Sequence, residues 1–288
     1  MDYINLFAAM VSSATLSIMS SLFGRHNSKA ENTSYLYSVI VTSAATITWG
    51  IICLLNEGFK LESIGFSVIY GAFYTIAMIG MFKAYQIGSV SLTAFIKQLS
   101  LIAVSVWGFI FWGNSLTLNI AIGIILIVVA LYLCLKTKES GGQKISLKWC
   151  LFAMMLLVGN AGCSIVQKYQ QMAFNRNGNA FMFFGALFSL LVSVVLYLIN
   201  IKHKPKGITK HTLVYPVIGG ISSAMLNLLI LHLITSSLSV SIIFPGIAVG
   251  GLSLTMFFSL VVYKEKLSVQ QWCGFLIGVV ALVFLNLA

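Results

Sequence analysis

The sequence predicts an all-helical membrane protein with ten transmembrane helices, arranged as two five-helix repeats of opposite orientation. Three observations support this prediction: charged residues make up 8% of the 288 residues, hydrophobic residues make up 59%, and the apolar residues fall in long runs. A soluble domain carries about 25% charged residues, because its surface faces water. A chain this poor in charge has no such surface, so we expect lipid to be its solvent.

Each helix that spans the hydrocarbon core needs about 20 predominantly apolar residues. The segments that meet this requirement are 3–22, 34–55, 63–84, 89–112, 116–135, 149–168, 180–200, 213–235, 238–262 and 268–287. They are continuously apolar rather than alternating, which excludes a transmembrane β-barrel. Trp112, Trp149 and Trp272 stand at segment ends, where an aromatic belt is expected.

The net charge of +11 lies in the loops between these segments, which argues against nucleic-acid binding. Basic residues are concentrated after odd-numbered segments, for example at 136–148, at 202–210 and at Lys264 and Lys266. Lysine and arginine favour the cytoplasmic side of a membrane protein. We therefore predict a multi-pass protein of a bacterial cell membrane with both termini outside.

A basic linker at 139–148 divides the chain into two predicted repeats, 1–138 and 149–288. Asn114-Ser115-Leu116-Thr117 matches Glu265-Lys266-Leu267-Ser268 at an offset of 151, and Gly123 and Gly274 follow at the same spacing. Two units of five helices have opposite orientations, because five is odd. Inverted repeats of this kind are a common plan in transporters, with the substrate bound at mid-membrane between them.

The second half carries motifs that resemble the drug/metabolite transporter superfamily, in its EamA-like branch. These are Ile243-Phe244-Pro245, Gly250-Gly251 and Lys264-Glu265-Lys266-Leu267-Ser268, followed by Gly274 and Gly278. The stretch from Phe82 to Thr117 is similar to the same repeat, although Asn114 stands where the family pattern has glutamate. The resemblance implies a transporter with a central cavity lined mainly by helices 1, 3, 4, 6, 8 and 9.

Lys97 is the most informative candidate for substrate binding, because it lies about eight residues inside the fourth segment. A lysine at that depth costs about 2.5–3.5 kcal/mol on insertion scales, so it is unsuited to face lipid. It either faces the cavity and meets an anionic group, or extends toward the headgroups or to backbone carbonyls. By contrast, no carboxylate lies deep in any segment, so we expect a neutral, zwitterionic or anionic solute rather than a cationic drug.

Other polar residues share helix faces and are further candidates for lining a cavity. They are Tyr70, Tyr74, Thr93, Gln98, Asn160, Ser164, Asn227 and Ser241. For the serines, close helix packing is the alternative, since small hydroxyl residues also join membrane helices. Pro245 within a helix predicts a kink, and Gly250 and Gly251 predict close packing beside it. We expect this segment to be a hinge in the moving or binding part of a transporter, with a static kink that only packs as the alternative. Glu265 we expect to cap or pair in its loop.

These features predict a secondary transporter that moves a small organic solute, such as an amino-acid-like metabolite or a drug, by alternating access, for example in efflux. A lipid flippase or scramblase is the nearest alternative. A membrane-embedded enzyme is disfavoured because the four histidines are scattered and no catalytic set is visible. We predict no catalytic residues, no metal, no cofactor and no nucleic acid; the expected partners are the solute and the bilayer, with the protein a monomer or homodimer.

Overall fold

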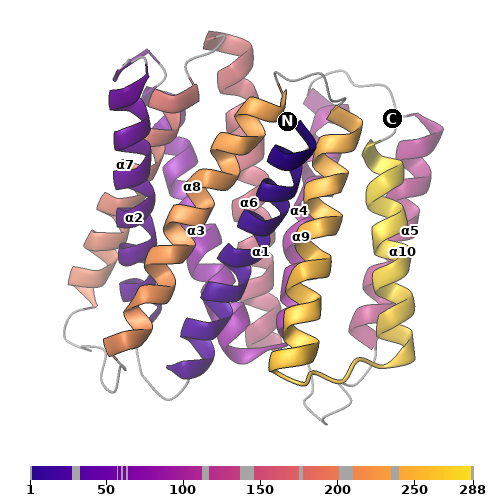
Figure 1. The fold of residues 1–288 in the computed structure, drawn as a ribbon. Coiled ribbons are helices and arrows are strands. Elements are labelled where there is room, and N and C mark those ends of the chain that lie inside the picture. Colours follow the sequence, from indigo (N-terminus) through magenta and orange to yellow (C-terminus); the bar gives the residue numbers. More distant parts are fainter. Residues whose placement is uncertain are drawn as a thin grey trace.

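The computed structural model describes residues 2–27, 33–56, 58–59, 61–62, 64–111, 117–136, 146–174, 178–200, 210–234 and 240–286. Over these ranges the chain is a bundle of helices without strands (Figure 1). The helices are α1 (Asp2–His26), α2 (Thr33–Leu55), α3 (Ile64–Ile87), α4 (Val90–Phe111), α5 (Leu118–Lys136), α6 (Leu147–Phe174), α7 (Gly178–Ile199), the short 3-10 helix η2 (Lys210–Leu213), α8 (Val214–Ile234), α9 (Val240–Val262) and α10 (Val269–Asn286). The start of α1 and the end of α10 lie at the same side of the bundle.

Each predicted segment corresponds to one α-helix, and most boundaries agree within three residues. The largest differences are at the ends of α1 and α6, which continue to His26 and Phe174 instead of ending near 22 and 168. Both extensions carry polar residues, such as Arg25 and Gln171. A helix can continue past the hydrocarbon boundary, so apolar length alone marks its membrane part rather than its end.

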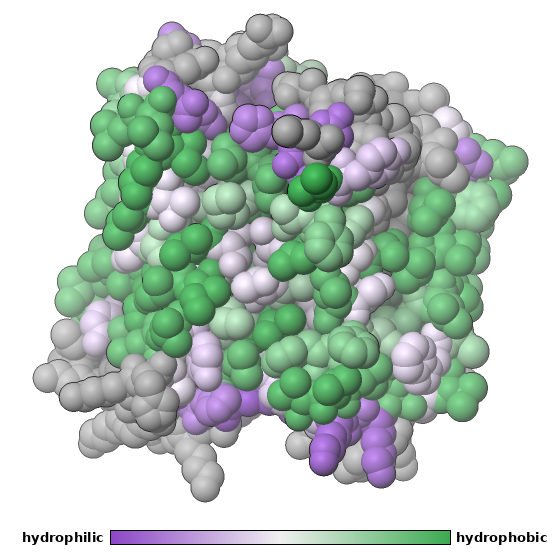
Figure 2. Space-filling view, viewed as in Figure 1, coloured by the Kyte–Doolittle hydropathy of each residue, from purple (hydrophilic) through white to green (hydrophobic). Residues whose placement is uncertain are grey.

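The surface of the bundle is apolar at mid-height, as expected of a protein in lipid. Figure 2 shows hydrophobic side chains over the middle of the visible face, with hydrophilic ones gathered toward the top and bottom. Large side chains such as Leu54 and Phe257 are 73% and 67% exposed. In the described part of the chain, α1, α2, α3, α6, α7 and α8 are long and apolar enough to cross a membrane. A multi-pass membrane protein follows from these properties.

The helices of the first half pack mainly on helices of the second half. The closest associations are α3 with α6 and α7, α1 with α8 and α9, α2 with α7 and α8, α4 with α6 and α9, and α5 with α10. Small residues allow this close approach: a Cβ added at Gly159 of α6 would come within 2.5 Å of the Ala77 backbone nitrogen of α3. Helix association in lipid depends on such close packing.

Hydroxyl side chains within the helices bond to their own backbone or across helix contacts. Ser20 Oγ donates to Leu16 O at 2.6 Å, and Thr75 Oγ1 and Ser189 Oγ join α3 to α7 at 2.8 Å. Ser38 Oγ and Ser193 Oγ join α2 to α7 in the same way. These bonds satisfy hydroxyls that hydrocarbon could not solvate, each contributing about 0.6 kcal/mol.

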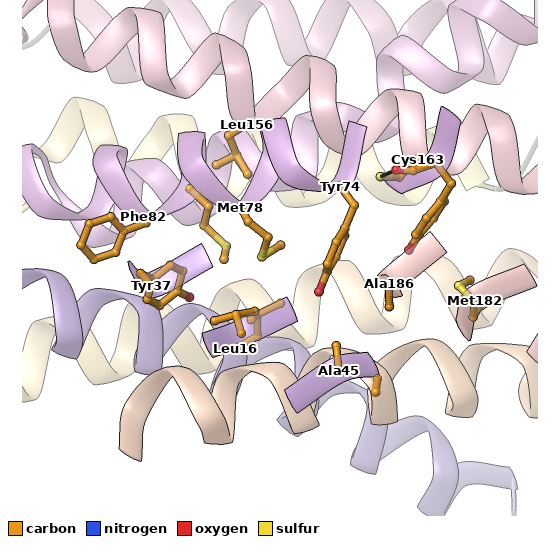
Figure 3. Close-up of a cluster of buried hydrophobic side chains, with 14 of the residues drawn as sticks. Leu16, Tyr37, Ala45, Tyr74, Met78, Phe82, Leu156, Cys163, Met182 and Ala186 are labelled. Atoms are coloured by element: carbon orange, nitrogen blue, oxygen red, sulfur yellow. Dashed lines mark hydrogen bonds between the residues drawn. The ribbon is translucent and has the colours of Figure 1, made fainter. Parts of the chain in front are cut away.

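One end of the bundle is filled by aromatic side chains. It is the end where α1 finishes, α4 begins and α9 leads into α10, and we refer to it as the Glu265 end. Phe23, Tyr37, Phe82 and Tyr85 are fully buried there, and the rings of Tyr37 and Phe82 stack at 4.7 Å. Figure 3 shows Tyr37 and Phe82 beside Leu16 and Met78 of the same cluster. Among the described residues, these side chains pack closely at this end.

Candidate functional site

Lys97 is held inside the bundle by a hydroxyl rather than by a carboxylate. It lies in α4, its side chain is half-buried, and its Nζ donates to Ser17 Oγ of α1 at 3.2 Å. Among the residues that the structure describes, no carboxylate pairs with it. A buried ammonium with one neutral acceptor retains donors for a further anionic or polar group. This geometry suits recognition of an anion.

Tyr70 and Tyr74 of α3 lie at a second polar position, in a small pocket between α2, α3, α7 and α8. Their rings stack at 5.9 Å, and Tyr74 Oη and Ser223 Oγ are hydrogen-bonded at 2.9 Å. The pocket has a volume of about 10 Å³, room for roughly one water molecule. Its lining residues are Ala45, Trp49, Tyr70, Tyr74, Met182, Ala186, Ser223 and Asn227, several of which appear in Figure 3.

Asn227 lines the same pocket as the two tyrosines, whereas Lys97 is not among the lining residues. Asn227 is half-buried, and its Nδ2 donates to Ser223 O one turn earlier in α8 at 2.9 Å. The pocket uses α2 and α7, which were absent from the helices expected around a central cavity. The Lys97–Ser17 contact between α4 and α1 and the pocket around Tyr74 between α3 and α8 are thus two separate positions.

The other α4 candidates differ in their surroundings. Thr93 is fully buried, where its Oγ1 donates to Ser89 O at 2.7 Å and accepts from Trp149 Nε1 at 3.1 Å. Thr93 is therefore engaged in packing α4 against α6, whereas Gln98 is half-buried. Trp149 is only 3% exposed, so it is an interior residue and not part of an aromatic belt, in contrast to Trp272, which is 43% exposed. Trp112 lies outside the described residues.

The candidates on α6 and α9 lie on helices that contact the first half of the chain. Asn160 and Ser164 of α6 are half-buried. Gly250 and Gly251 of α9 pack closely on α1, because an added Cβ would meet Met10 Sδ at 2.5 Å and Ser13 Oγ at 2.9 Å respectively. α9 is helical through Ser241 and Pro245, whose side chains lie outside the described residues.

Glu265 caps the start of α4, as expected of a loop carboxylate, and pairs with an arginine. Its Oε1 accepts from Val90 N at 2.9 Å and from Arg25 Nη2 at 2.6 Å. Its Oε2 accepts from Ser91 N at 3.3 Å and from the hydroxyls of Ser89, Ser91 and Ser259. A carboxylate at a helix N-terminus satisfies unpaired backbone N–H groups and complements the helix dipole.

Tyr263 completes this arrangement beside Arg25. The Arg25 guanidinium lies 4.0 Å from the centre of the Tyr263 ring, and Tyr263 Oη and Ser21 Oγ are hydrogen-bonded at 3.0 Å. Burial raises the pKa of Tyr263 above its ordinary value, so the phenol stays protonated and neutral beside Glu265. Sequence reasoning had not paired Arg25 with Glu265, because the two are 240 residues apart. No local pattern signals a contact over that distance.

The Tyr74–Ser223 bond gives a testable prediction about the pocket. Tyr74→Phe is expected to lower the free energy of unfolding by about 0.5–1.5 kcal/mol, the usual net value of a buried hydrogen bond. Thermal unfolding of Tyr74→Phe, Ser223→Ala and the double variant in detergent would measure it, with the exposed Tyr3→Phe as control. The two effects should be non-additive, because the variants share one bond; full additivity would contradict the assignment.

Comparison with known proteins supplies the family. Residues 2–136 match the model of the EamA-like transporter family. A solved crystal structure described without any activity is similar to this chain with a TM-score of 0.65 and 11% identity, covering 99% of this chain and 96% of that one. At this identity the likeness establishes the fold alone. No curated protein sequence matches the chain.

Proposed function

This chain belongs to the EamA-like transporter family through its first half, and from this premise we propose that it is a secondary transporter of a small organic solute. The apolar surface and helical bundle supply the membrane-embedded body that such a protein requires. The family name implies transport but specifies no solute. The chemistry of the interior must therefore define the substrate class.

The half-buried Lys97 ammonium is the observation that carries our proposal for the substrate. Its partner in the described part of the chain is the Ser17 hydroxyl, which is neutral. A solute with a carboxylate or another anionic group would compensate this charge in a region where water is scarce. We therefore propose an anionic or zwitterionic metabolite, with an amino-acid-like solute as the first class to test and a neutral solute as the next.

Alternating access between two inverted halves, 1–138 and 149–288, is the mechanism that we propose. The offset of 151 relates α4 to α9 and α5 to α10 within about one residue at each boundary. If the two halves are exchanged, α3 corresponds to α8, α4 to α9 and α6 to α1. The α3–α6 contact then corresponds to the α8–α1 contact, and the α4–α6 contact corresponds to the α9–α1 contact. All four contacts exist. This correspondence supports a twofold relation between the halves, in which the α4–α9, α5–α10 and α2–α7 contacts each map onto themselves. Residues 139–145 of the linker lie outside the described residues, and α6 begins at Leu147 within the predicted linker.

Reconstitution tests the proposed transport directly. Purified protein in liposomes should exchange a radiolabelled anionic or zwitterionic solute loaded inside, chosen from a thermal-shift screen, because a bound ligand stabilises the folded state. Protein-free liposomes and liposomes with heat-denatured protein are the controls. Movement of a fluorescent phospholipid without solute exchange would instead support a scramblase and would overturn the transporter proposal.

The orientation that we propose places the Glu265 end in the cytoplasm and both termini outside, at a bacterial cell membrane. Exposed single-cysteine variants at each end test this. Asn56→Cys, between α2 and α3, should react with a membrane-impermeant maleimide in intact cells, whereas Lys266→Cys should react only after permeabilisation. The reverse pattern would invert the orientation.

A further inference from the structure

Four side chains on one face of α1 form a polar line between the Lys97 position and the Glu265 end. Ser13, Ser17, Ser21 and Arg25 recur every four residues, which places them on the same side of the helix. The three serines are buried, and the side chain of Arg25 is 34% exposed. A line of polar groups inside an apolar bundle is costly unless each member has a partner.

Each of the last three members of this line contacts a different partner from α4 or the α9–α10 region. Ser17 accepts from Lys97 of α4, Ser21 bonds to Tyr263, and Arg25 donates to Glu265. Tyr85 of α3 lies along the same line, fully buried, near Ser17, Tyr263 and Glu265. Movement of α1 would therefore change the surroundings of Lys97 and of Glu265 together.

Glu265 is the point at which three elements meet. Its carboxylate joins the last turn of α1 through Arg25, the first turn of α4 through Val90 and Ser91, and the last turn of α9 through Ser259. The side chain of Glu265 is only 12% exposed. Directly inside this contact lies the aromatic cluster of Phe23, Tyr37, Phe82 and Tyr85 that fills the Glu265 end. Separation of α1 from α4 at this end requires the carboxylate to release its donors.

The sequence provides this carboxylate at one end only. Position 114, which the offset of 151 aligns with Glu265, is Asn. Positions 240 and 242, aligned with Ser89 and Ser91, are Val and Ile. A five-helix repeat therefore does not in general require a carboxylate that accepts hydrogen bonds from serines. A contact present at one end alone biases a transporter toward the conformation that closes that end.

We propose that Glu265 is a latch that holds the Glu265 end closed by joining α1, α4 and the α9–α10 loop. This inference rests on the proposed transport function, because it assigns the latch to one side of an alternating-access cycle. The latch opens when Arg25 and the start of α4 leave the carboxylate. The aromatic cluster can then separate, and the interior becomes accessible from this side.

Cysteine accessibility tests the latch without any need for a substrate. In full-length protein with the five native cysteines replaced by alanine, Ser20→Cys places a thiol in the closed end, since Ser20 is fully buried against Tyr37. Adding Glu265→Gln, which removes the charge and keeps the shape, should raise the maleimide labelling rate about tenfold, the effect of 1.4 kcal/mol on an open–closed equilibrium. Glu62→Gln, at a carboxylate between α2 and α3, should leave the rate unchanged.

The outcomes separate the latch from the proposed function. An unchanged labelling rate in a Glu265→Gln variant with wild-type thermal stability would overturn the latch and make Glu265 a static cap. If Glu265→Gln does not fold, Glu265→Asp, which keeps the charge on a shorter side chain, should show an intermediate increase, and no increase would again reject the latch. Faster labelling in a protein that exchanges no solute would reject the transporter and retain the latch.

Discussion

Lys97→Ala is expected to reduce exchange of an anionic or zwitterionic solute in liposomes by at least about 30-fold. Removal of one partner from a buried charged pair costs about 2–5 kcal/mol, because the other charge remains in a region poor in water. The solute would lose its counter-charge, while Ser17 would lose only a donor. Exchange rates at several solute concentrations would show whether the loss is in affinity or in turnover.

The fold should tolerate this substitution, since alanine removes a residue whose insertion costs about 2.5–3.5 kcal/mol. Thermal unfolding is therefore expected at or above the wild-type midpoint. Lys97→Arg should restore part of the exchange, because it retains the charge. Lys83→Ala is the matched control: Lys83 is a half-buried lysine of α3 whose Nζ lies 5.3 Å from the Phe152 ring centre. Normal exchange by Lys97→Ala would show that the substrate does not depend on this charge.

Gly159→Leu is expected to prevent assembly of the bundle. An added Cβ at this position lies 2.5–2.8 Å from Ala77 backbone and side-chain atoms, and Gly80 makes an equally close approach to α6 from the opposite side. The remaining atoms of leucine would force α3 and α6 apart. Overpacking of a well-packed contact costs about 1–3 kcal/mol or more, and this contact joins the two halves.

Size-exclusion chromatography and thermal unfolding in detergent would measure this effect. Gly159→Leu should yield little monodisperse protein, and Gly159→Ala should lie between it and the wild type. Gly65→Leu in α3 serves as control, because an added Cβ there meets nothing within 4 Å. A stable, monodisperse Gly159→Leu protein would mean that α3 and α6 can separate without loss of the fold.

Helix positions were predictable from the sequence because the apolar runs are longer than any soluble core helix requires. The transporter family was likewise predicted from short motifs around Pro245 and Glu265, and residues 2–136 confirm the family. Hydropathy did not predict the polar ends of α1 and α6 or the interior position of Trp149. A tryptophan at the start of a helix suits either a lipid interface or a neighbouring glycine such as Gly88, and only packing decides.

The candidate site was predictable residue by residue but not as an arrangement. Helical spacing placed Tyr70 and Tyr74 on one face, and the structure adds their contact with Ser223 of α8, 149 residues away from Tyr74. Lys97 was identified by depth alone, and its partner Ser17 was not among the predicted site residues. Periodicity determines which side chains share a face of one helix. It contains no information on which helix that face meets.

The interleaved packing of the two halves bears on how the protein is made. During synthesis α1, α2 and α3 enter the membrane before α6, α7 and α8 exist, so the surfaces that will later be joined first meet lipid or the insertion machinery. Insertion and final assembly are therefore separate events in time. Two polypeptides divided within the linker should each insert, yet should yield a stable protein only when produced together.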